Sequence, residues 1–185
     1  MKEILRAIIP KAYNTATELT SEELVDDYGE QIFRFCLRLT YSKEDAEDLF
    51  QETFMRAFEQ LPKVNASGNP KSFLFSTALY LWKSKKRTYA RRNRIAPIQA
   101  LDYEVVSDID IEYRVMAQED IQLVREIVHA LPEKFKIPIM LYYSAEMDLP
   151  DIAATLKLPI GTVKSRLHRA RKAVEKGLVN IGYGE

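Results

Sequence analysis

Two stretches of this sequence gather side chains that can bind nucleic acid. Residues 83–94 (KSKKRTYARRNR) contain seven bases and no acid, and residues 157–176 contain seven bases and one acid. Lys and Arg side chains hold phosphates, and aromatic rings beside them can stack on bases. Cations this dense repel one another unless an anion lies between them, so phosphate contact is the favoured interpretation of residues 83–94.

The second basic stretch divides into two faces when it is drawn as a helix that begins near residue 160. At about 100° per residue, one narrow stripe is apolar and consists of Val163, Leu167, Ala170 and Val174. The opposite stripe carries hydrogen-bond donors, namely Lys164, Ser165, His168, Arg169 and Lys172. One face can therefore pack while the other meets base edges and phosphates in a DNA major groove. Arg166 and Arg171 flank the donors and suit phosphates better than bases.

A shorter helix is predicted immediately before this one, at residues 149–156. Asp148 can cap it, and Pro150 suits its first turn. Ala153 is small where two crossing helices must approach closely, and residues 157–159 make the break. These features favour a helix-turn-helix that binds duplex DNA over an ordinary helix pair with a solvated basic face.

A third polar pattern is acidic, because residues 21–60 hold eleven acids against four bases. In the helix predicted at residues 43–61, the stripe expected to be buried consists of Ala46, Phe50, Thr53, Phe54, Ala57 and Leu61. The opposite side gathers Glu44, Asp48, Gln51, Glu52 and Met55. The pattern alone leaves two interpretations equally favoured: a solvated face, or a docking surface for a basic partner.

Aromatic side chains precede and enter the first basic stretch, namely Phe73, Phe75, Tyr80, Trp82 and Tyr89. Beside so many cations they could stack on the bases of a single strand. For any one of them, however, a place in the core is favoured. A plausible buried stripe consists of Phe75, Ala78, Leu79 and Trp82.

Apolar residues recur at three- and four-residue steps along most of the chain, and this period predicts an all-α protein. Helices are expected at about 20–40, 43–61, 70–92, 115–130, 133–146, 149–156 and 160–177. Pro138 predicts a kink or a shifted start in its helix. Residues 95–113 hold five acids and no base and lack a helical stripe, so we expect an acidic, flexible linker there.

This linker would join two small helical domains, residues 20–94 and residues 114–185, the second with the helix-turn-helix. Residues 1–19 would form an N-terminal extension.

Composition narrows the function classes. The 185 residues carry 27 bases and 27 acids, which excludes a uniformly basic surface. Cys36 is the single cysteine and lies in an apolar run, which indicates a buried thiol in a reducing compartment. The longest apolar stretch, Phe73 to Trp82, is ten residues and too short to span a bilayer. We therefore expect a cytoplasmic protein without stable membrane insertion.

Catalysis is not expected from this sequence. The two histidines, His129 and His168, lie 39 residues apart. No glycine-rich phosphate loop or metal-ligand cluster accompanies them. We expect no enzyme activity, no cofactor and no metal.

Taken together, the motifs resemble those of the extracytoplasmic-function (ECF) sigma factors of bacterial RNA polymerase. The similarity runs from about residue 20 to residue 178 and is strongest in DAEDLFQETFMRAF and LPIGTVKSRLHRARKAV. It implies a sigma factor that binds core RNA polymerase and directs promoter-specific initiation by recognising −35 and −10 elements. Residues 20–94 would then be sigma region 2 and residues 114–185 sigma region 4. The alternative is a stand-alone helix-turn-helix regulator whose first domain senses a ligand or dimerises.

The resemblance also implies partners and site residues. In the family, the DAEDLFQE helix docks on the clamp coiled coil of the largest polymerase subunit, a role that falls here to Asp48, Gln51 and Glu52. Capture of a flipped −10 base and of the melted strand falls to Asn65, Lys71, Phe73, Phe75, Tyr80, Lys83, Lys86, Arg87 and Arg91. Reading of the −35 duplex falls to Lys164, Ser165, Arg166, His168, Arg169 and Lys172. An anti-sigma factor is implied as a regulatory partner.

Overall fold

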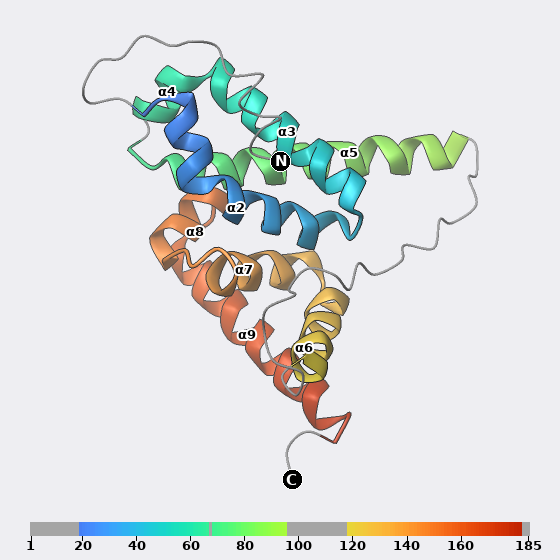
Figure 1. The fold of residues 1–185 in the computed structure, drawn as a ribbon. Helices are drawn as coiled ribbons and strands as arrows, with labels where there is room; N and C mark the ends of the chain where they lie inside the picture. Colours follow the sequence, from blue (N-terminus) through green and yellow to red (C-terminus); the bar gives the residue numbers. More distant parts are fainter. Residues whose placement is uncertain (1–18, 67, 96–117, 183–185) are drawn as a thin grey trace. The chain divides into compact units, whose positions relative to one another are not determined.

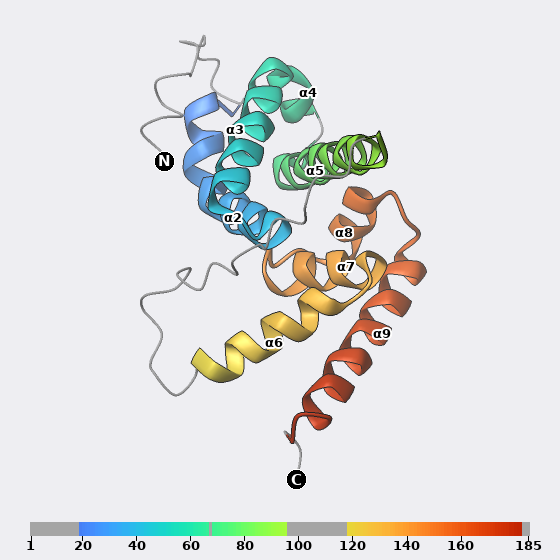
Figure 2. The ribbon, with the colours of Figure 1, turned by 90° about the vertical axis from the view of Figure 1, so that its right-hand side faces the viewer.

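The computed structural model describes residues 19–66, 68–95 and 118–182. Every regular element in these ranges is an α-helix, which confirms the predicted fold class. The chain divides into two compact units, Met1–Val106 with helices α2 to α5 and Ser107–Glu185 with helices α6 to α9 (Figure 1, Figure 2). The extension predicted at residues 1–19 and the linker predicted at residues 95–113 lie, except for their edges, outside the described residues.

The first two helices of unit 1 begin where capping chemistry predicts. Helix α2 (Ser21–Thr40) opens with a capping box, in which the Glu23 N–H donates to the Thr20 hydroxyl and the Thr20 N–H donates back to the Glu23 carboxylate. Helix α3 (Lys43–Glu59) opens at Ser42, whose hydroxyl accepts from the Asp45 N–H at 3.2 Å. Only Tyr41 and Ser42 join the two helices, so they pack as close neighbours.

Helix α5 (Pro70–Ile95) completes the three-helix core of unit 1. Its start is capped by the Asn69 side-chain oxygen, which accepts from the Ser72 N–H at 2.8 Å. Helices α2, α3 and α5 pack against one another around large rings, and the Phe35 and Phe75 ring centroids lie 4.9 Å apart. This packing fixes the outward faces of α3 and α5, where most of the candidate residues of unit 1 lie.

One short helix of unit 1 was not expected. Helix α4 (Leu61–Ala66) lies mostly in the gap between the helices expected at residues 43–61 and 70–92, and Val64 within it is fully buried. Leu61 was predicted to end the buried stripe of the preceding helix, but it begins α4 and is only half-buried. The rest of that stripe is buried as predicted, namely Ala46, Phe50, Thr53, Phe54 and Ala57.

Unit 2 consists of helices α6 (Gln118–Ala130), α7 (Glu133–Tyr143), α8 (Leu149–Leu156) and α9 (Ile160–Val179). Helix α9 packs against the other three helices. Pro138 lies buried inside α7, which begins at Glu133 as expected, so the proline does not shift the start of the helix. The core of this unit includes Leu141, Ile152, Val163, Leu167 and Ala170.

The break between α8 and α9 has a defined hydrogen-bonded form. Asp148 caps α8, because its carboxylate accepts from the Asp151 N–H at 2.8 Å. Lys157 ends the helix in the left-handed conformation with φ of 53°. The Leu158 N–H then donates to the Ala153 carbonyl at 3.0 Å, as in a Schellman motif. The predicted helix-turn-helix break is therefore a tight, hydrogen-bonded turn.

Candidate functional site

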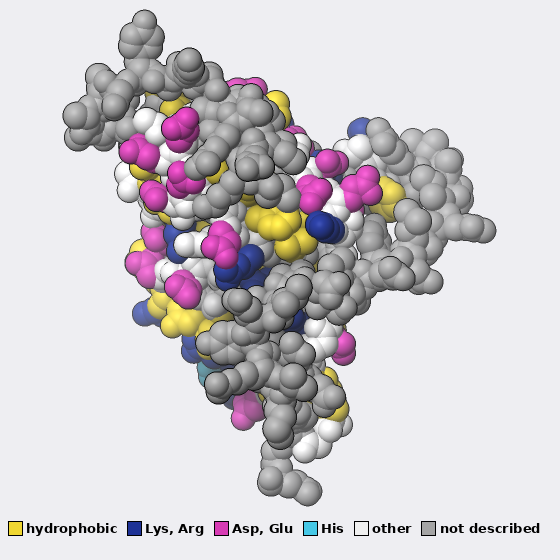
Figure 3. Space-filling model, in the orientation of Figure 1, with side chains coloured by type: hydrophobic (Ala, Val, Ile, Leu, Met, Phe, Trp, Pro, Cys, Tyr) yellow, Lys and Arg dark blue, Asp and Glu magenta, His cyan; other side chains and the backbone are white. Residues whose placement is uncertain are grey.

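Helix α9 has the two faces that its sequence predicts. Val163, Leu167 and Ala170 are at most 2% exposed and pack into unit 2, whereas Val174, the last residue of the predicted apolar stripe, is only half-buried. The donors on the other side are all exposed, namely Lys164, Ser165, His168, Arg169 and Lys172. Figure 3 shows Lys and Arg side chains along the edge of α9. The helix is therefore anchored by one face and presents hydrogen-bond donors on the other.

The two arginines that flank this donor face are held differently. Arg166 is half-buried, whereas Arg171 is exposed and its guanidinium lies over two rings of α7. The guanidinium carbon is 5.3 Å from the Tyr142 ring centroid and 5.6 Å from that of Tyr143. Stacking of this kind orients an arginine and helps to tie α9 to α7.

Helix α3 presents an acidic face to solvent. Asp48 is exposed, Gln51 and Glu52 are half-buried, and Met55 is 46% exposed on the same side. In Figure 3, acidic side chains gather over α2 and the start of α3. The surface is thus anionic and has one apolar side chain within it, a composition that suits a basic protein partner.

Glu52, one residue of this acidic face, forms ion pairs within unit 1. Its carboxylate lies 3.7 Å from an Arg56 nitrogen and 3.5 Å from the Lys85 nitrogen of α5. Both distances are within ion-pair range, and all three side chains remain partly exposed. The candidate docking residue therefore also links α3 to the basic helix α5.

The residues assigned to the single strand are not all accessible. Phe75 is 0% exposed and packs on Phe35, so burial removes it from the candidate DNA surface. Phe73 and Lys71 are half-buried, and Tyr80 is 57% exposed. The predicted cations of α5 are all exposed, namely Lys83, Lys86, Arg87 and Arg91. Asn65 is half-buried, and its amide donates to the Leu19 carbonyl at 3.2 Å.

Sequence reasoning missed Arg56, and it missed the contact of Lys85, a cation of the predicted basic stretch, with Glu52. Arg56 lies over the Tyr80 ring, with its guanidinium carbon 5.8 Å from the ring centroid, and Lys85 reaches Glu52. The four-residue spacing of Glu52 and Arg56 on a helix could have indicated their pairing. The contacts of Tyr80 and Lys85 had no such signal, because they depend on how α3 packs on α5.

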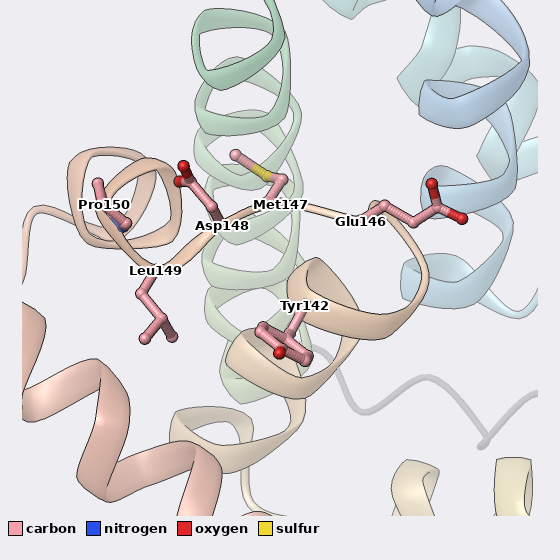
Figure 4. A pocket seen from close by; sticks show the side chains of 6 residues that line it. All are labelled: Tyr142, Glu146, Met147, Asp148, Leu149 and Pro150. Atoms are coloured by element: carbon pink, nitrogen blue, oxygen red, sulfur yellow. The ribbon is translucent and has the colours of Figure 1, made fainter.

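Unit 2 has a hollow of about 570 Å³ at the corner between α7 and α8. It is lined by Tyr142, Glu146, Met147, Asp148, Leu149 and Pro150. Figure 4 shows the Tyr142 and Leu149 side chains on one side of the connecting segment and Met147 and Asp148 on the other. Asp148 is already engaged as the cap of α8, so the hollow offers few polar groups to orient a ligand.

The described residues show no arrangement for metal or thiol chemistry. No group of three His, Cys, Asp or Glu side chains among them could hold a metal ion. Cys36 is fully buried, and desolvation raises the pKa of its thiol well above the ordinary value. Across the described ranges, no helix combines the length and the apolar character needed to cross a membrane.

Both halves of the chain match family models of sigma-70 regions. The family model "Sigma-70 region 2" matches residues 24–92, and the model "Sigma-70, region 4" matches residues 121–174. The chain is 30% identical over 166 residues to the ECF RNA polymerase sigma factor SigW of Bacillus subtilis, with 86% of this chain and 89% of SigW covered. It is 29% identical to the ECF sigma-E factor of Haemophilus influenzae, with 82% and 84% covered.

Solved structures share the fold. The sigma factor RpoE of Bartonella quintana, crystallised with the anti-sigma factor NepR, superposes with a TM-score of 0.72 at 22% identity, covering 85% of this chain and 97% of that one. CnrH, in complex with the cytosolic domain of CnrY, gives a TM-score of 0.63 at 20% identity and covers 88% of each chain.

Proposed function

The chain belongs to the ECF subfamily of RNA polymerase sigma factors, and we propose that three of its surfaces each make one of the contacts needed for promoter-specific initiation. Proteins of this family are not enzymes. They bind core RNA polymerase and promoter DNA and direct the polymerase to its promoters. The three surfaces are the acidic face of α3, the exposed side of α5 and the donor face of α9.

Helix α9 reads the −35 duplex. The observation that carries this assignment is its division into a packed face and a donor face. Lys164, Ser165, His168, Arg169 and Lys172 face the major groove, and Arg166 beside them suits a phosphate. A helix anchored by Val163, Leu167 and Ala170 can hold these donors in register with successive bases.

Helix α3 docks on the clamp coiled coil of the largest polymerase subunit through Asp48, Gln51 and Glu52. Support comes from their shared face, its negative charge and the exposed Met55 within it. Charge steers the encounter with a basic partner, and the apolar side chain gains contact area when water leaves the interface.

Helix α5 and the segment before it bind the melted −10 strand. The residues of this surface are Asn65, Lys71, Phe73, Tyr80, Lys83, Lys86, Arg87 and Arg91, without the buried Phe75. Exposed cations and the exposed ring of Tyr80 on a single helix support the assignment. In domain terms, residues 20–94 act as sigma region 2, residues 114–185 as sigma region 4, residues 95–113 as the linker and residues 1–19 as an extension.

An anti-sigma factor is the regulatory partner that fits this assignment, and the cytoplasm is the compartment. Two proteins of the same fold were crystallised in complexes, one of them with an anti-sigma factor. Promoter DNA and polymerase share one compartment in a bacterium, so a protein that must bind both acts there.

The docking assignment is tested by reversing one charge. Asp48→Lys should weaken binding to core polymerase by at least about tenfold, because a cation then faces a basic partner. Asp48 is preferred to Glu52 because Glu52 also pairs with Arg56 and Lys85. Fluorescence anisotropy of labelled full-length protein titrated with core enzyme measures the affinity.

Asp27→Lys is the matched control, since Asp27 is also an exposed acid but lies on α2. It should bind core enzyme like the unmodified chain, and circular dichroism should show equal helical content in both variants. Retained affinity in Asp48→Lys would remove α3 from the docking surface.

Run-off transcription separates a sigma factor from a stand-alone regulator. Addition of the purified chain to core polymerase should create defined start sites on genomic DNA. A regulator would instead bind duplex DNA tightly without polymerase and would leave the start sites of core enzyme unchanged.

A further inference from the structure

Met55 is an exposed methionine, whereas the other sulfur groups that the structure describes are buried. It lies near the end of α3 and is 46% exposed. Met140 and Met147, in unit 2, are at most 4% exposed, and Cys36 is 0% exposed. Burial also raises the pKa of the Cys36 thiol, which keeps this thiol protonated and unreactive. Within the described residues, a dissolved oxidant therefore reaches the Met55 thioether most easily.

Met55 lies in the middle of the acidic face of α3. Asp48, Gln51 and Glu52 precede it by seven, four and three residues, which places all three within about 60° of it around the helix. Glu59, one turn beyond Met55, is also an exposed acid. A partner that contacts the three docking residues must therefore cover the Met55 side chain as well.

The thioether suits such a contact only in its reduced form. A methionine side chain is apolar, flexible and polarisable, so it adapts to the surface that covers it. Oxidation to the sulfoxide adds a strongly polar S=O group, which loses its hydrogen bonds to water when it is buried. The neighbouring carboxylates of Asp48 and Glu52 only accept hydrogen bonds, so they cannot replace that water. The oxidised side chain is thus costly to bury at the same contact.

We propose that Met55 is an oxidation site through which hydrogen peroxide reversibly lowers the affinity of the chain for core polymerase. In the reaction, a sulfur lone pair forms a bond to one peroxide oxygen, and the O–O bond breaks. The sulfur loses two electrons and becomes the sulfoxide, while the other oxygen is reduced and leaves with both protons as water. This inference rests on the proposed docking of α3 and adds a chemical signal that controls it.

The acidic face favours this oxidant, and the sulfoxide stays open to repair. Hydrogen peroxide carries no charge at neutral pH, so the carboxylates around Met55 do not repel it as they would repel an anionic oxidant. Methionine sulfoxide reductases return the sulfoxide to the thioether, and a side chain as exposed as Met55 is accessible to them. Docking should in turn protect Met55 from peroxide, because the partner then covers it.

The first test measures core binding before and after oxidation. The full chain is treated with hydrogen peroxide, and peptide mass spectrometry confirms the sulfoxide at Met55. Fluorescence anisotropy with core enzyme should then show an affinity lower by about 5- to 50-fold, because a polar group is buried without a partner. Treatment with methionine sulfoxide reductases of both stereospecificities should restore the affinity. Met55→Leu, the matched control, should bind like the unmodified chain and keep its affinity after peroxide treatment.

Further measurements test the contact itself. Met55→Gln places a polar, uncharged side chain of similar length in the docking surface and should weaken core binding by about 3- to 30-fold, with unchanged helical content. Core enzyme should slow the appearance of the Met55 sulfoxide under peroxide, as followed by mass spectrometry. Helix α9 contains no methionine, so the oxidised and reduced chains should bind duplex DNA equally well.

The outcomes separate this inference from the function on which it rests. If the oxidised chain binds core enzyme as tightly as the reduced chain while Asp48→Lys binds less tightly, the oxidation switch is refuted and the proposed docking of α3 stands. An equal loss of affinity in peroxide-treated Met55→Leu would also refute the switch, because another group would then be responsible. If Asp48→Lys and Met55→Gln both bind like the unmodified chain and core enzyme does not protect Met55, both the switch and the proposed docking of α3 are wrong.

Discussion

Individual residues of unit 1 serve more than one contact, and Glu52 is the clearest case. It belongs to the acidic face of α3, yet its carboxylate also meets Arg56 and Lys85. These pairs are partly exposed, so each is worth at most about 1 kcal/mol. Their importance lies in position, because Arg56 in turn supports the Tyr80 ring. A substitution at Glu52 is therefore expected to affect both polymerase binding and strand binding.

Arg169 offers a residue-level test of the donor face of α9. If the Arg169 guanidinium contacts a base edge, Arg169→Ala should reduce the binding free energy of holoenzyme by about 1–3 kcal/mol at promoters with the preferred −35 base. The loss should be much smaller at promoters that lack this base. Arg166→Ala, at the half-buried flank, should weaken binding to all promoters by a similar factor, because a phosphate contact does not depend on the base sequence. Filter binding of reconstituted holoenzyme to a set of −35 variants measures both. A uniform loss in Arg169→Ala would make Arg169 a phosphate contact.

The helices themselves could largely be predicted from the sequence, because caps and apolar periodicity are local signals. Helix α3 begins at residue 43 and Asp148 caps α8, both as expected, and Val163 and Leu167 are buried as expected. Helix α4 could not be predicted in this way, since six residues are too few to show a period. Its Pro62, a residue suited to a first helical turn, was the available signal.

The candidate surfaces were only partly predictable for a related reason. Phe75 and Tyr80 are both aromatic and lie five residues apart, yet one is 0% exposed and the other 57%. A preference for the core was the correct default for Phe75, and no single-helix pattern places Arg56 over Tyr80. Contacts between helices depend on the angles at which the helices pack. The spacing of residues within one helix does not predict these angles.

Close approach of α6 and α9 depends on one glycine. A Cβ added at Gly177 would lie 2.7 Å from a methyl carbon of Ile127, a contact too short for real side chains. Gly177→Ala should therefore destabilise this helix pair, although alanine would otherwise favour a helix by about 1 kcal/mol. Gly161→Ala in the same helix is the matched control, since nothing lies within 4 Å of its added Cβ. Hydrogen exchange of α6 and α9 amides should be faster only in Gly177→Ala, and Ile127→Ala in the same chain should reverse part of the effect. Equal protection in both glycine variants would contradict the close approach.

Considered as a whole, the molecule has no net charge, but it segregates charge along the chain. Its 27 bases and 27 acids cancel, while residues 83–94 and 157–176 are strongly basic and residues 21–60 are acidic. Screening limits electrostatic reach to about 8–10 Å at moderate salt. DNA phosphates should consequently be attracted by the cations nearest to them and hardly at all by the total charge of the protein.

The salt dependence of promoter binding distinguishes local cations from total charge. Each duplex phosphate contact contributes about 0.9 to the slope of log affinity against log salt, and each single-strand contact about 0.7. Lys172→Ala on α9 should therefore reduce the slope of holoenzyme binding by about 0.9 and Arg91→Ala on α5 by about 0.7. Asp27→Asn changes the net charge by the same magnitude but lies on the acidic helix α2, so it should leave the slope unchanged. The slope comes from holoenzyme affinities measured over a range of salt concentrations, and a change of similar size but opposite sign in Asp27→Asn would mean that total charge, rather than these two basic surfaces, governs binding.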